Sequence, residues 1–577
     1  MTRIQRIKYI FRILFGVIIG LYIGMNLLLN TTFVQNRLGS FVAKELQHVF
    51  QTEVAIGHID IGFFNRIIAE NLLLKDRQGD ELLKVARLSA KFDILPLFEK
   101  QLRISTVQLF GFNINLNKET PESIPNYQFV LDALASKDTT KSPSKLDLRI
   151  NSVLIRRGRI NYDVKSVPVT PQQFNPSHWG IDNLAATLSL KALNNDSLNV
   201  AIRRFSFNEQ NGFELKSMSV KAIANNHSLN IKDFHIEFPQ SYLKMDSAEI
   251  RYDSLPSLLQ LKDNTIYKGE MKGRLNTTDF STILPLLQNF TEPFDFRFAF
   301  KGNGGNLECP VFYLTDKKHL DLSAKMSVSD WNNPDSTYLH GQLSKLHVSR
   351  TGIPYLINNL VGKPVPILER MGTIDFKGLV KGQLKDLRFD GLLQTEAGSI
   401  KSNITMHRDQ ENFRSYSGSL ASPDLNVGLL MADDKKFGMA DFNIELQGFH
   451  YRDKYPETSI KGIVSSLDFN DYRYENITLD GLYKNGGFNG ALVLDDENIN
   501  LAINGIFNPT LRMPTYNLEA VVNHLRPNEL HLSDKYVDSD ISMKLTADFT
   551  GRSIDDLKGF ILLDSLKLNA PEEQAYF

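Results

Sequence analysis

Apolar and polar side chains alternate with a period of two over much of this chain. Residues 112–117 read FNINLN, so that the apolar residues fall on one side of an extended backbone and the asparagines on the other. Residues 87–94, RLSAKFDI, alternate in the same way. The two apolar stripes are Leu88, Ala90, Phe92 and Ile94, and Phe112, Ile114 and Leu116. Each segment is therefore predicted to be a β-strand with one apolar and one polar face.

The same alternation recurs almost to residue 577, and helical patterns are few and short. They are limited, after residue 51, to residues 96–100, 127–135, 281–290 and 353–360. We therefore expect a mainly β fold, in which an N-terminal helix precedes an elongated, curved, mostly antiparallel sheet. Such a sheet can pair with a second sheet, close as a barrel or coil into a trough around something apolar. Alternation alone does not choose among these three.

Several strand patterns end on an apolar residue, any residue and glycine. The pairs are Phe300 and Gly302, Val380 and Gly382, Leu446 and Gly448, and Phe549 and Gly551. Their spacing is irregular, which argues against a solenoid of fixed period and favours a meander. Glycine in or beside a strand permits bulges and strong curvature.

The N-terminus predicts a membrane anchor. Residues 13–29, ILFGVIIGLYIGMNLLL, are almost wholly apolar and are near the minimum length that spans a bilayer. The four basic residues before them predict a cytoplasmic tail at residues 1–12, with the body on the other side of the membrane. A cleaved signal peptide is the alternative, but no small-x-small cleavage pattern follows. Residues 30–51 then carry apolar residues at spacings of three and four, which predicts an amphipathic helix.

The remaining chain is divided by its loops. Residues 52–135 are expected to form an N-terminal β module, residues 136–180 a loop-rich excursion with strands, and residues 181–577 an elongated β meander. The excursion begins with SKDTTKSPS at residues 136–144 and contains the proline-rich stretch 168–179.

Composition excludes several classes of function. The net charge is -1 and no long basic block follows the first dozen residues, which argues against nucleic-acid binding. The single cysteine, Cys309, excludes an internal disulfide framework and a multi-cysteine metal site.

The motifs of common enzymes are missing from the sequence. There is no His-Glu-x-x-His, Gly-x-Ser-x-Gly or Gly-x-x-x-x-Gly-Lys-Ser/Thr pattern. The stretch KGNGGN around Gly302–Gly305 is interpreted as a hairpin turn, and His235 as an exposed or hydrogen-bonded histidine. The acidic pairs at 433–434, 495–496 and 555–556 are interpreted as solvated loops rather than calcium or acid–base sites. No catalytic residue, metal or cofactor is predicted, and we do not expect an enzyme.

The order of segments at the N-terminus resembles the AsmA-like superfamily, and within it proteins related to TamB, the inner-membrane subunit of the translocation and assembly module. The resemblance rests on the basic start and anchor, VQNRLGSFVAKELQHVF, the segment from TEVAIGHIDIG to KFDILPLF, and LRISTVQLFGFNINL. The resemblance covers about 100 residues. The rest of the chain shares only the meander of strands with this family.

The resemblance implies an inner-membrane protein whose β-groove extends into the periplasm and which acts in phospholipid transport to the outer membrane or in outer-membrane biogenesis. Leu88, Ala90, Phe92, Ile94, Phe112, Ile114 and Leu116 would then line the groove, with phospholipids and an outer-membrane β-barrel protein as partners. TamB relatives usually run longer and finish with a characteristic β domain, so the sequence is expected to be either a piece or a short relative. An assembly or secretion factor that docks β-barrel clients without carrying lipid is the alternative.

Overall fold

The protein is mainly β in the computed structural model, as the alternation predicts. The described residues are 3–576 apart from 30, 63–64, 94–101, 135–145, 148–150, 194–196, 255–263, 361, 411–412, 452–456, 509–513, 534–537, 553–555 and 570–573. The chain divides into two compact units, Met1–Pro293 (unit 1) and Phe294–Phe577 (unit 2). The predicted stripe residue Ile94, the helix at 96–100 and the linker at 136–144 lie outside the described residues.

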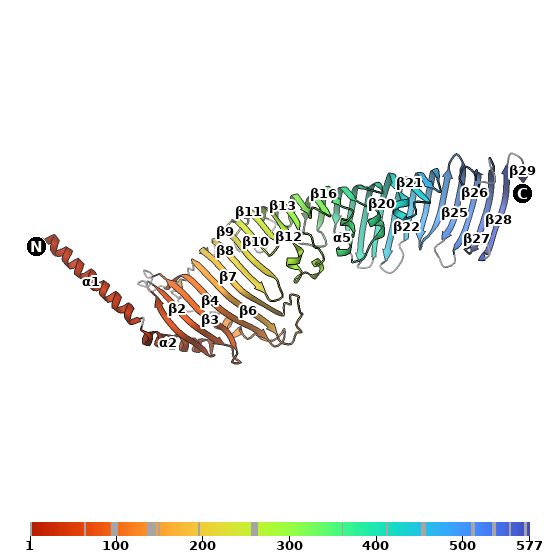
Figure 1. The fold of residues 1–577 in the computed structure, drawn as a ribbon. Coiled ribbons are helices and arrows are strands. Elements are labelled where there is room, and N and C mark those ends of the chain that lie inside the picture. The colour runs from red at the N-terminus through yellow and green to blue at the C-terminus, as the bar shows by residue number, and fades with distance from the viewer. Residues whose placement is uncertain are drawn as a thin grey trace. The chain divides into compact units, whose positions relative to one another are not determined.

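Unit 1 begins with helices and continues as a sheet (Figure 1). Its helices are α1 (Arg3–Leu29), α2 (Thr32–Phe50), α4 (Gln128–Leu134) and the 3-10 turns η2 (Thr277–Phe280) and η3 (Pro285–Leu287). Its strands are β1 (Val54–Gly62), β2 (Arg66–Lys75), β3 (Glu81–Phe92), β4 (Leu102–Lys118), β5 (Leu146–Asp147), β6 (Ser152–Val164), β7 (His178–Leu193), β8 (Leu198–Glu209), β9 (Glu214–Ala224), β10 (Ser228–Glu237), β11 (Tyr242–Arg251) and β12 (Ile266–Leu275).

The predicted helix at residues 13–29 is present as part of α1. Within the part of the chain that the structure describes, however, no helix combines the length and apolarity needed to cross a membrane. The amphipathic helix predicted at residues 30–51 is confirmed as α2, which packs on β1 through Gly39 and Ile59.

Neighbouring strands of unit 1 pair antiparallel along the chain, with one exception. β4 and β6 run parallel, in register from Thr106 and Ser152 to Lys118 and Val164, and β5 also pairs parallel with β4. A parallel pair needs a crossover connection, and the segment between β4 and β6 contains α4. The prediction of a mostly antiparallel sheet is therefore confirmed.

Unit 2 is a meander of more strands, with three short helices among its described residues. The helices are α5 (Gly352–Leu360), α6 (Pro366–Arg370) and α7 (Val427–Met431). The strands are β13 (Phe294–Asn303), β14 (Asn306–Thr315), β15 (Leu320–Ser329), β16 (Tyr338–Val348), β17 (Ile374–Gln383), β18 (Asp386–Thr395), β19 (Gly398–Gln410), β20 (Phe413–Asn426), β21 (Phe437–Tyr451), β22 (Glu457–Phe469), β23 (Tyr472–Lys484), β24 (Gly487–Asp495), β25 (Ile499–Asn508), β26 (Thr515–Leu525), β27 (Asp540–Thr550), β28 (Lys558–Asn569) and β29 (Gln574–Tyr576).

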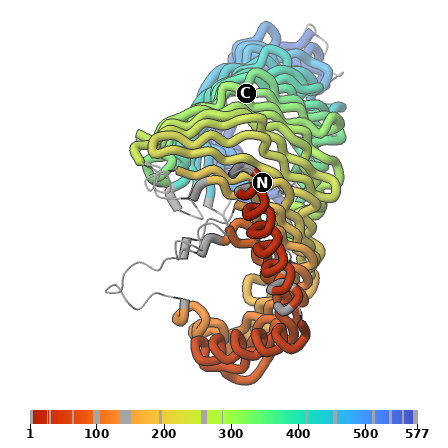
Figure 2. Tube along the Cα trace, turned by 90° about the vertical axis from the view of Figure 1, so that its left-hand side faces the viewer, coloured from red at the N-terminus to blue at the C-terminus, as the bar shows by residue number. Residues whose placement is uncertain are grey.

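Each strand of unit 2 pairs antiparallel with the next one along the chain, and the strands curve (Figure 2). The described sheet is open, which favours the trough among the three predicted arrangements. Because the strands alternate in direction, β16, β20 and β26 all end at the same edge of this sheet, meaning the edge that is formed by strand ends and their connections. The connection after β16 contains α5 and α6, and the connection after β20 contains α7. The connection after β26 contains the turn at residues 526–533. One edge of unit 2 therefore carries all three helices that the structure describes in this unit.

Candidate functional site

One face of the unit 2 sheet is apolar across many strands. The pairing register places the side chains of this face in four rows, each running across the strands from β17 to β27 or β28. Row A contains Phe376, Leu393, Ile400, Ser422, Phe442, Val464, Ile477, Leu494, Leu501, Val522 and Met543. Row B contains Gly378, Gly391, Ser402, Leu420, Ile444, Gly462, Leu479, Leu492, Ile503, Ala520, Leu545 and Leu563.

Rows C and D continue this face toward the opposite edge. Row C contains Val380, Phe389, Ile404, Gly418, Leu446, Ile460, Gly481, Gly490, Gly505, Leu518, Ala547 and Ile561. Row D contains Gly382, Leu387, Met406, Tyr416, Gly448, Thr458, Tyr483, Phe488, Phe507, Tyr516, Phe549 and Gly559. We call these four rows the apolar face of unit 2.

The opposite face of the same strands is more polar, although it also carries exposed apolar residues such as Ile463, Leu482 and Ile506. Between rows B and C, for example, the register runs through Asp390, Asn403, Ser419, Glu445, Lys461 and Asp480. Lys461 and Asp480 form an ion pair with a nitrogen–oxygen distance of 2.8 Å. The unit 2 sheet is therefore amphipathic across its thickness: one face is suited to water and the other is suited to apolar material.

The helices and turns at one edge cover row A but leave the other rows open. Leu430 of α7 packs with Ile400 and Phe442, and Leu530, which is wholly buried, packs with Ile477 and Ile499. Row D lies at the far side, where Tyr483 is 40% and Phe507 is 48% exposed. Most side chains of rows B and C are half-buried. The apolar face is therefore closed along one edge and accessible along the other.

Glycines make room for large rings on this face. An added Cβ at Gly391 would come within 2.6 Å of the Phe376 ring, and one at Gly448 within 2.7 Å of the Tyr416 ring. The Phe488 ring occupies the same position over Gly481. The apolar-x-Gly pairs Val380–Gly382 and Leu446–Gly448 occupy rows C and D, as the period of two requires.

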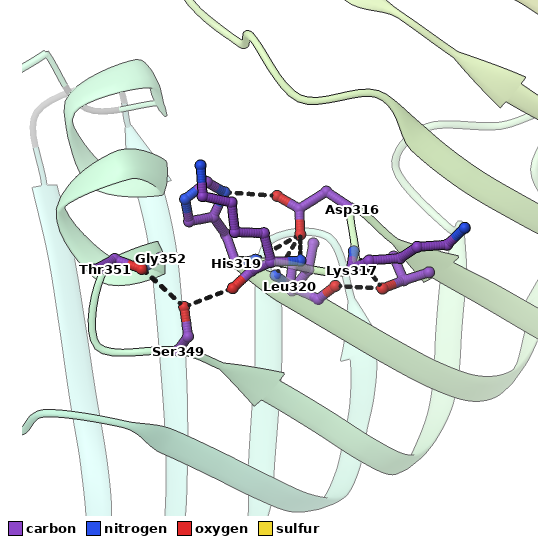
Figure 3. A network of polar contacts seen from close by, with 9 residues as sticks. Asp316, Lys317, His319, Leu320, Ser349, Thr351 and Gly352 are labelled. Carbon is purple, nitrogen blue, oxygen red and sulfur yellow. Dashed lines mark hydrogen bonds and ion pairs between the residues drawn. The ribbon is translucent and has the colours of Figure 1, made fainter.

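A buried aspartate fastens the connection that carries α5 (Figure 3). Asp316 accepts hydrogen bonds from the backbone N–H groups of Lys318, His319 and Leu320, and from the His319 ring at 2.9 Å. Burial raises the pKa of the Asp316 carboxyl, but these donors outweigh burial and the net pKa is lowered. The His319 ring stacks on Tyr355 of α5 with centroids 4.2 Å apart.

Ser349 also forms hydrogen bonds to the turn that contains Asp316 and His319. Its backbone N–H donates to the His319 carbonyl at 3.0 Å, and its hydroxyl donates to the Lys318 carbonyl at 2.9 Å. Gly352, the first residue of α5, is so close that an added Cβ would lie 2.5 Å from the His319 oxygen. The turn after β14 therefore fixes where α5 starts.

The predicted stripe residues of unit 1 lie on one apolar face but in different rows. Leu88 pairs with Leu109, and Ala90 with Val107, whereas Ile114 pairs with Leu83 and Phe112 with Val85. Phe92 pairs with Ile104. Leu88, Phe112 and Ile114 share one cluster with Val85 and Leu184.

A line of left-handed residues separates these rows. Asn71 of β2, Gly111 of β4, Arg157 of β6 and Asn183 of β7 have φ values between 53° and 59° and lie at similar heights in the sheet. β3, which lies between β2 and β4, has no left-handed residue. Such a residue breaks the period of two, so that Leu109 and Phe112, three residues apart, share a face. We call these four residues the left-handed line.

Leu116 differs from the other stripe residues because helices cover it. It packs beside Phe129 and Val130 of α4, together with Leu46 and Phe50 of α2. The Phe50 and Phe129 rings meet edge to face at 6.4 Å. The N-terminal end of the unit 1 apolar face is therefore filled by protein side chains.

Of the acidic pair at residues 495 and 496, Asp495 is exposed at the end of β24, but Asp496 is buried and corrects the interpretation of a solvated loop. Asp496 is 8% exposed, accepts the Tyr472 hydroxyl and receives the backbone N–H groups of Glu475 and Asn498. Burial and the Asp496 carboxylate raise the pKa of Tyr472 to about 12. Asp496 thus organises a turn. Among the described residues no group of three or more histidine, cysteine, aspartate or glutamate side chains is placed to hold a metal ion.

The fold and its rows define a class, namely open β-sheet proteins with one accessible apolar face. No family model, curated protein or solved structure matches this chain. The resemblance to TamB-related proteins therefore stays a prediction.

Proposed function

We propose that this protein carries phospholipids between the inner and outer membranes along a β-groove formed by its apolar face. The observation that carries the proposal is the continuity of rows B, C and D, which stay apolar and half-buried across successive strands without a covering layer in the described residues. A soluble protein rarely leaves so long an apolar surface open unless it binds something there.

The mechanism would be passive. Acyl chains lie on rows B to D, while headgroups stay in water beyond row D, the accessible edge. Burial of each methylene contributes about 0.8 kcal/mol, which holds a chain on the face. Because the rows repeat from strand to strand, neighbouring positions offer similar burial, and a lipid meets no deep minimum that would stop it from sliding. No catalytic residue is required for this function.

Attachment to the inner membrane, with the body in the periplasm, is part of this proposal. Its support is α1, whose large apolar residues from Tyr9 to Ile23 are between 39% and 69% exposed. These side chains surround the helix instead of forming one stripe, so contact with the unit 1 sheet does not bury them. A lipid environment would cover all of them.

Site-specific photo-crosslinking tests the lipid path with a matched control. A photoreactive phenylalanine is placed at Tyr483 or Phe507 of row D, and in control variants at Leu482 or Ile506. The control positions are adjacent in sequence, are 38% and 40% exposed, and lie on the polar face. The full chain is crosslinked in cells, and bound lipid is identified by mass spectrometry.

Lipid adducts at residues 483 and 507, and few at residues 482 and 506, are the expected result. Equal labelling of both faces would mean that lipid contacts are non-specific and would refute the groove. Absence of adducts at all four positions would refute it as well.

A second candidate is an assembly factor that docks a β-barrel protein, and one observation favours it. β28 pairs with β27 over its whole length, but on its other side only Lys567–Asn569 pair with β29 among the described residues. Phe560, Ile561, Leu562 and Leu563 of this strand are each more than half exposed. An apolar edge strand of this kind can pair with a strand added by another protein.

Charge on that edge distinguishes the two candidates. A Leu562→Lys substitution should abolish a β-barrel complex recovered by crosslinking while leaving lipid adducts at Phe507 unchanged, because Leu562 lies on the face opposite rows B to D. If the complex survives Leu562→Lys, pairing with this edge strand does not hold the client.

A further inference from the structure

A cavity of about 380 Å³ lies in unit 1, directly at the left-handed line, and its wall includes the buried apolar residues Val85 and Phe112 as well as polar ones. All four residues of the line contribute to its wall. The left-handed residues interrupt the alternation of side chains at this line. The cavity therefore coincides with an irregularity of the backbone.

The basic side chains of Lys84, Arg157 and Arg159 line this cavity, together with the acidic side chain of Asp182. Arg159 on β6 forms an ion pair with Asp182 on β7. The Lys84 Nζ atom lies 3.8 Å from a carboxylate oxygen of Glu81, a residue outside the cavity. Arg157 has no hydrogen-bond or ion-pair partner in the part of the chain that the structure describes. With Glu81 included, the local charge is still one positive unit, and Arg157 supplies it.

Arg157 also has a backbone conformation that arginine rarely adopts. Its φ is 53°, a region that favours glycine, asparagine or aspartate, and the other three members of the line are asparagine or glycine. An arginine there costs stability relative to glycine, while its guanidinium forms no hydrogen bond or ion pair within the described protein that would offset the cost. An external anionic ligand would account for this arginine.

Amide groups complete the lining. Asn71, Asn113 and Asn183 border the cavity. The Asn113 side-chain oxygen accepts from Asn161 at 3.4 Å, so its NH₂ group is left to donate. A guanidinium, an ammonium and amide donors around one cavity match the oxygens of a phosphate group.

We propose that this cavity binds a phosphate group, either free in solution or carried by a lipid headgroup. The cavity lies in unit 1, whereas the proposed groove is the apolar face of unit 2, so the site does not depend on the proposed groove. Arg157 is the principal ligand, with Lys84 as a second cation. The short sequence Arg156–Arg159, RRGR, is the signal that composition alone overlooks.

Binding of two probes to the full chain tests this site. The probes are inorganic phosphate, followed by isothermal titration, and vesicles of phosphatidylcholine with or without phosphatidylglycerol, followed by flotation. The variants are Arg157→Gly, which suits the positive φ, and Lys84→Gln. Lys232→Gln on β10 removes an equal charge from an exposed position of the same unit outside the cavity and serves as the control.

Arg157→Gly should weaken binding about tenfold, the effect of losing one charge-assisted hydrogen bond, and Lys232→Gln should have little effect. Loss of inorganic phosphate binding identifies a site for free phosphate. Loss that is confined to phosphatidylglycerol vesicles identifies a headgroup site. The proposal is overturned if the wild type binds neither probe, if Arg157→Gly and Lys84→Gln bind as the wild type does, or if Lys232→Gln weakens binding equally.

Discussion

The ring of Phe376 lies over Gly391, and these two residues belong to neighbouring rows of the apolar face. An added Cβ at Gly391 would come within 2.6 Å of the ring and within 2.5 Å of the Lys377 carbonyl oxygen. Gly391→Ala is therefore expected to lower the free energy of unfolding by about 1–3 kcal/mol, the usual cost of overpacking. Denaturant unfolding followed by circular dichroism measures the change.

Gly341 of β16 provides the matched control. It is a strand glycine of the same unit, but the atom nearest to an added Cβ is 3.7 Å away, an ordinary contact. Gly341→Ala should leave stability almost unchanged. Equal effects of the two substitutions would mean that strand propensity, and not the Phe376 ring, sets the cost.

Asp316 should make stability depend on pH in the acid range. Its pKa is lowered in the folded protein, so its carboxylate contributes stability above the unfolded value of about 3.9 and loses that contribution as the pH falls through the folded pKa. Asp316→Asn should cost about 1–3 kcal/mol at neutral pH because backbone donors lose a charged acceptor. The difference from wild type should shrink below about pH 4.

Thermal unfolding between about pH 3 and about pH 7 measures this effect, because a carboxyl group titrates within this range. Asp335 is the control, since its carboxylate is exposed and pairs with Lys385 at 2.7 Å on the surface. Asp335→Asn should change stability little, because surface ion pairs are weak. A pH-independent difference between wild type and Asp316→Asn would contradict the assignment.

Tyr472 should affect the alkaline range instead. Its pKa is raised to about 12, whereas an unfolded tyrosine titrates near about 10. The folded state therefore retains the proton more strongly, and the associated stability is present below about pH 10 and is lost as the pH rises toward about 12. Tyr472→Phe should remove this alkaline slope and should also lower stability at neutral pH, because Asp496 loses a hydrogen-bond donor. Unfolding curves at several alkaline pH values test both parts.

The sequence predicted the strand faces well because a period of two is local. The stripe of Phe112 and Ile114 and the glycines at 382 and 448 follow directly from alternation. Alternation could not show which stripe residues meet, since the register between strands depends on distant pairings. Leu88 and Phe112 seemed equivalent in sequence, yet they lie on opposite sides of the left-handed line.

Coverage of the apolar faces was also hidden from the sequence. Leu116 belongs to the same stripe as Ile114, but only tertiary packing places Phe129 over it. Likewise, Asp496 looked like a loop residue because an acidic pair usually is one, and its burial depends on Tyr472 from another strand. Short inserts between strands decide which parts of an open sheet stay accessible, and their docking is not encoded by any periodicity.

Arg157 gives the last prediction, which concerns stability rather than binding. A non-glycine residue in the left-handed region costs about 1 kcal/mol, and glycine avoids this cost at the expense of a more flexible unfolded chain. Because the Arg157 guanidinium has no partner in the described protein, Arg157→Gly should leave the free energy of unfolding unchanged or raise it by up to about 1 kcal/mol. Arg157→Val should lower it, since a β-branched residue tolerates positive φ poorly. Chemical denaturation of the three proteins measures the order, and a destabilised Arg157→Gly would show that the arginine supports the fold itself.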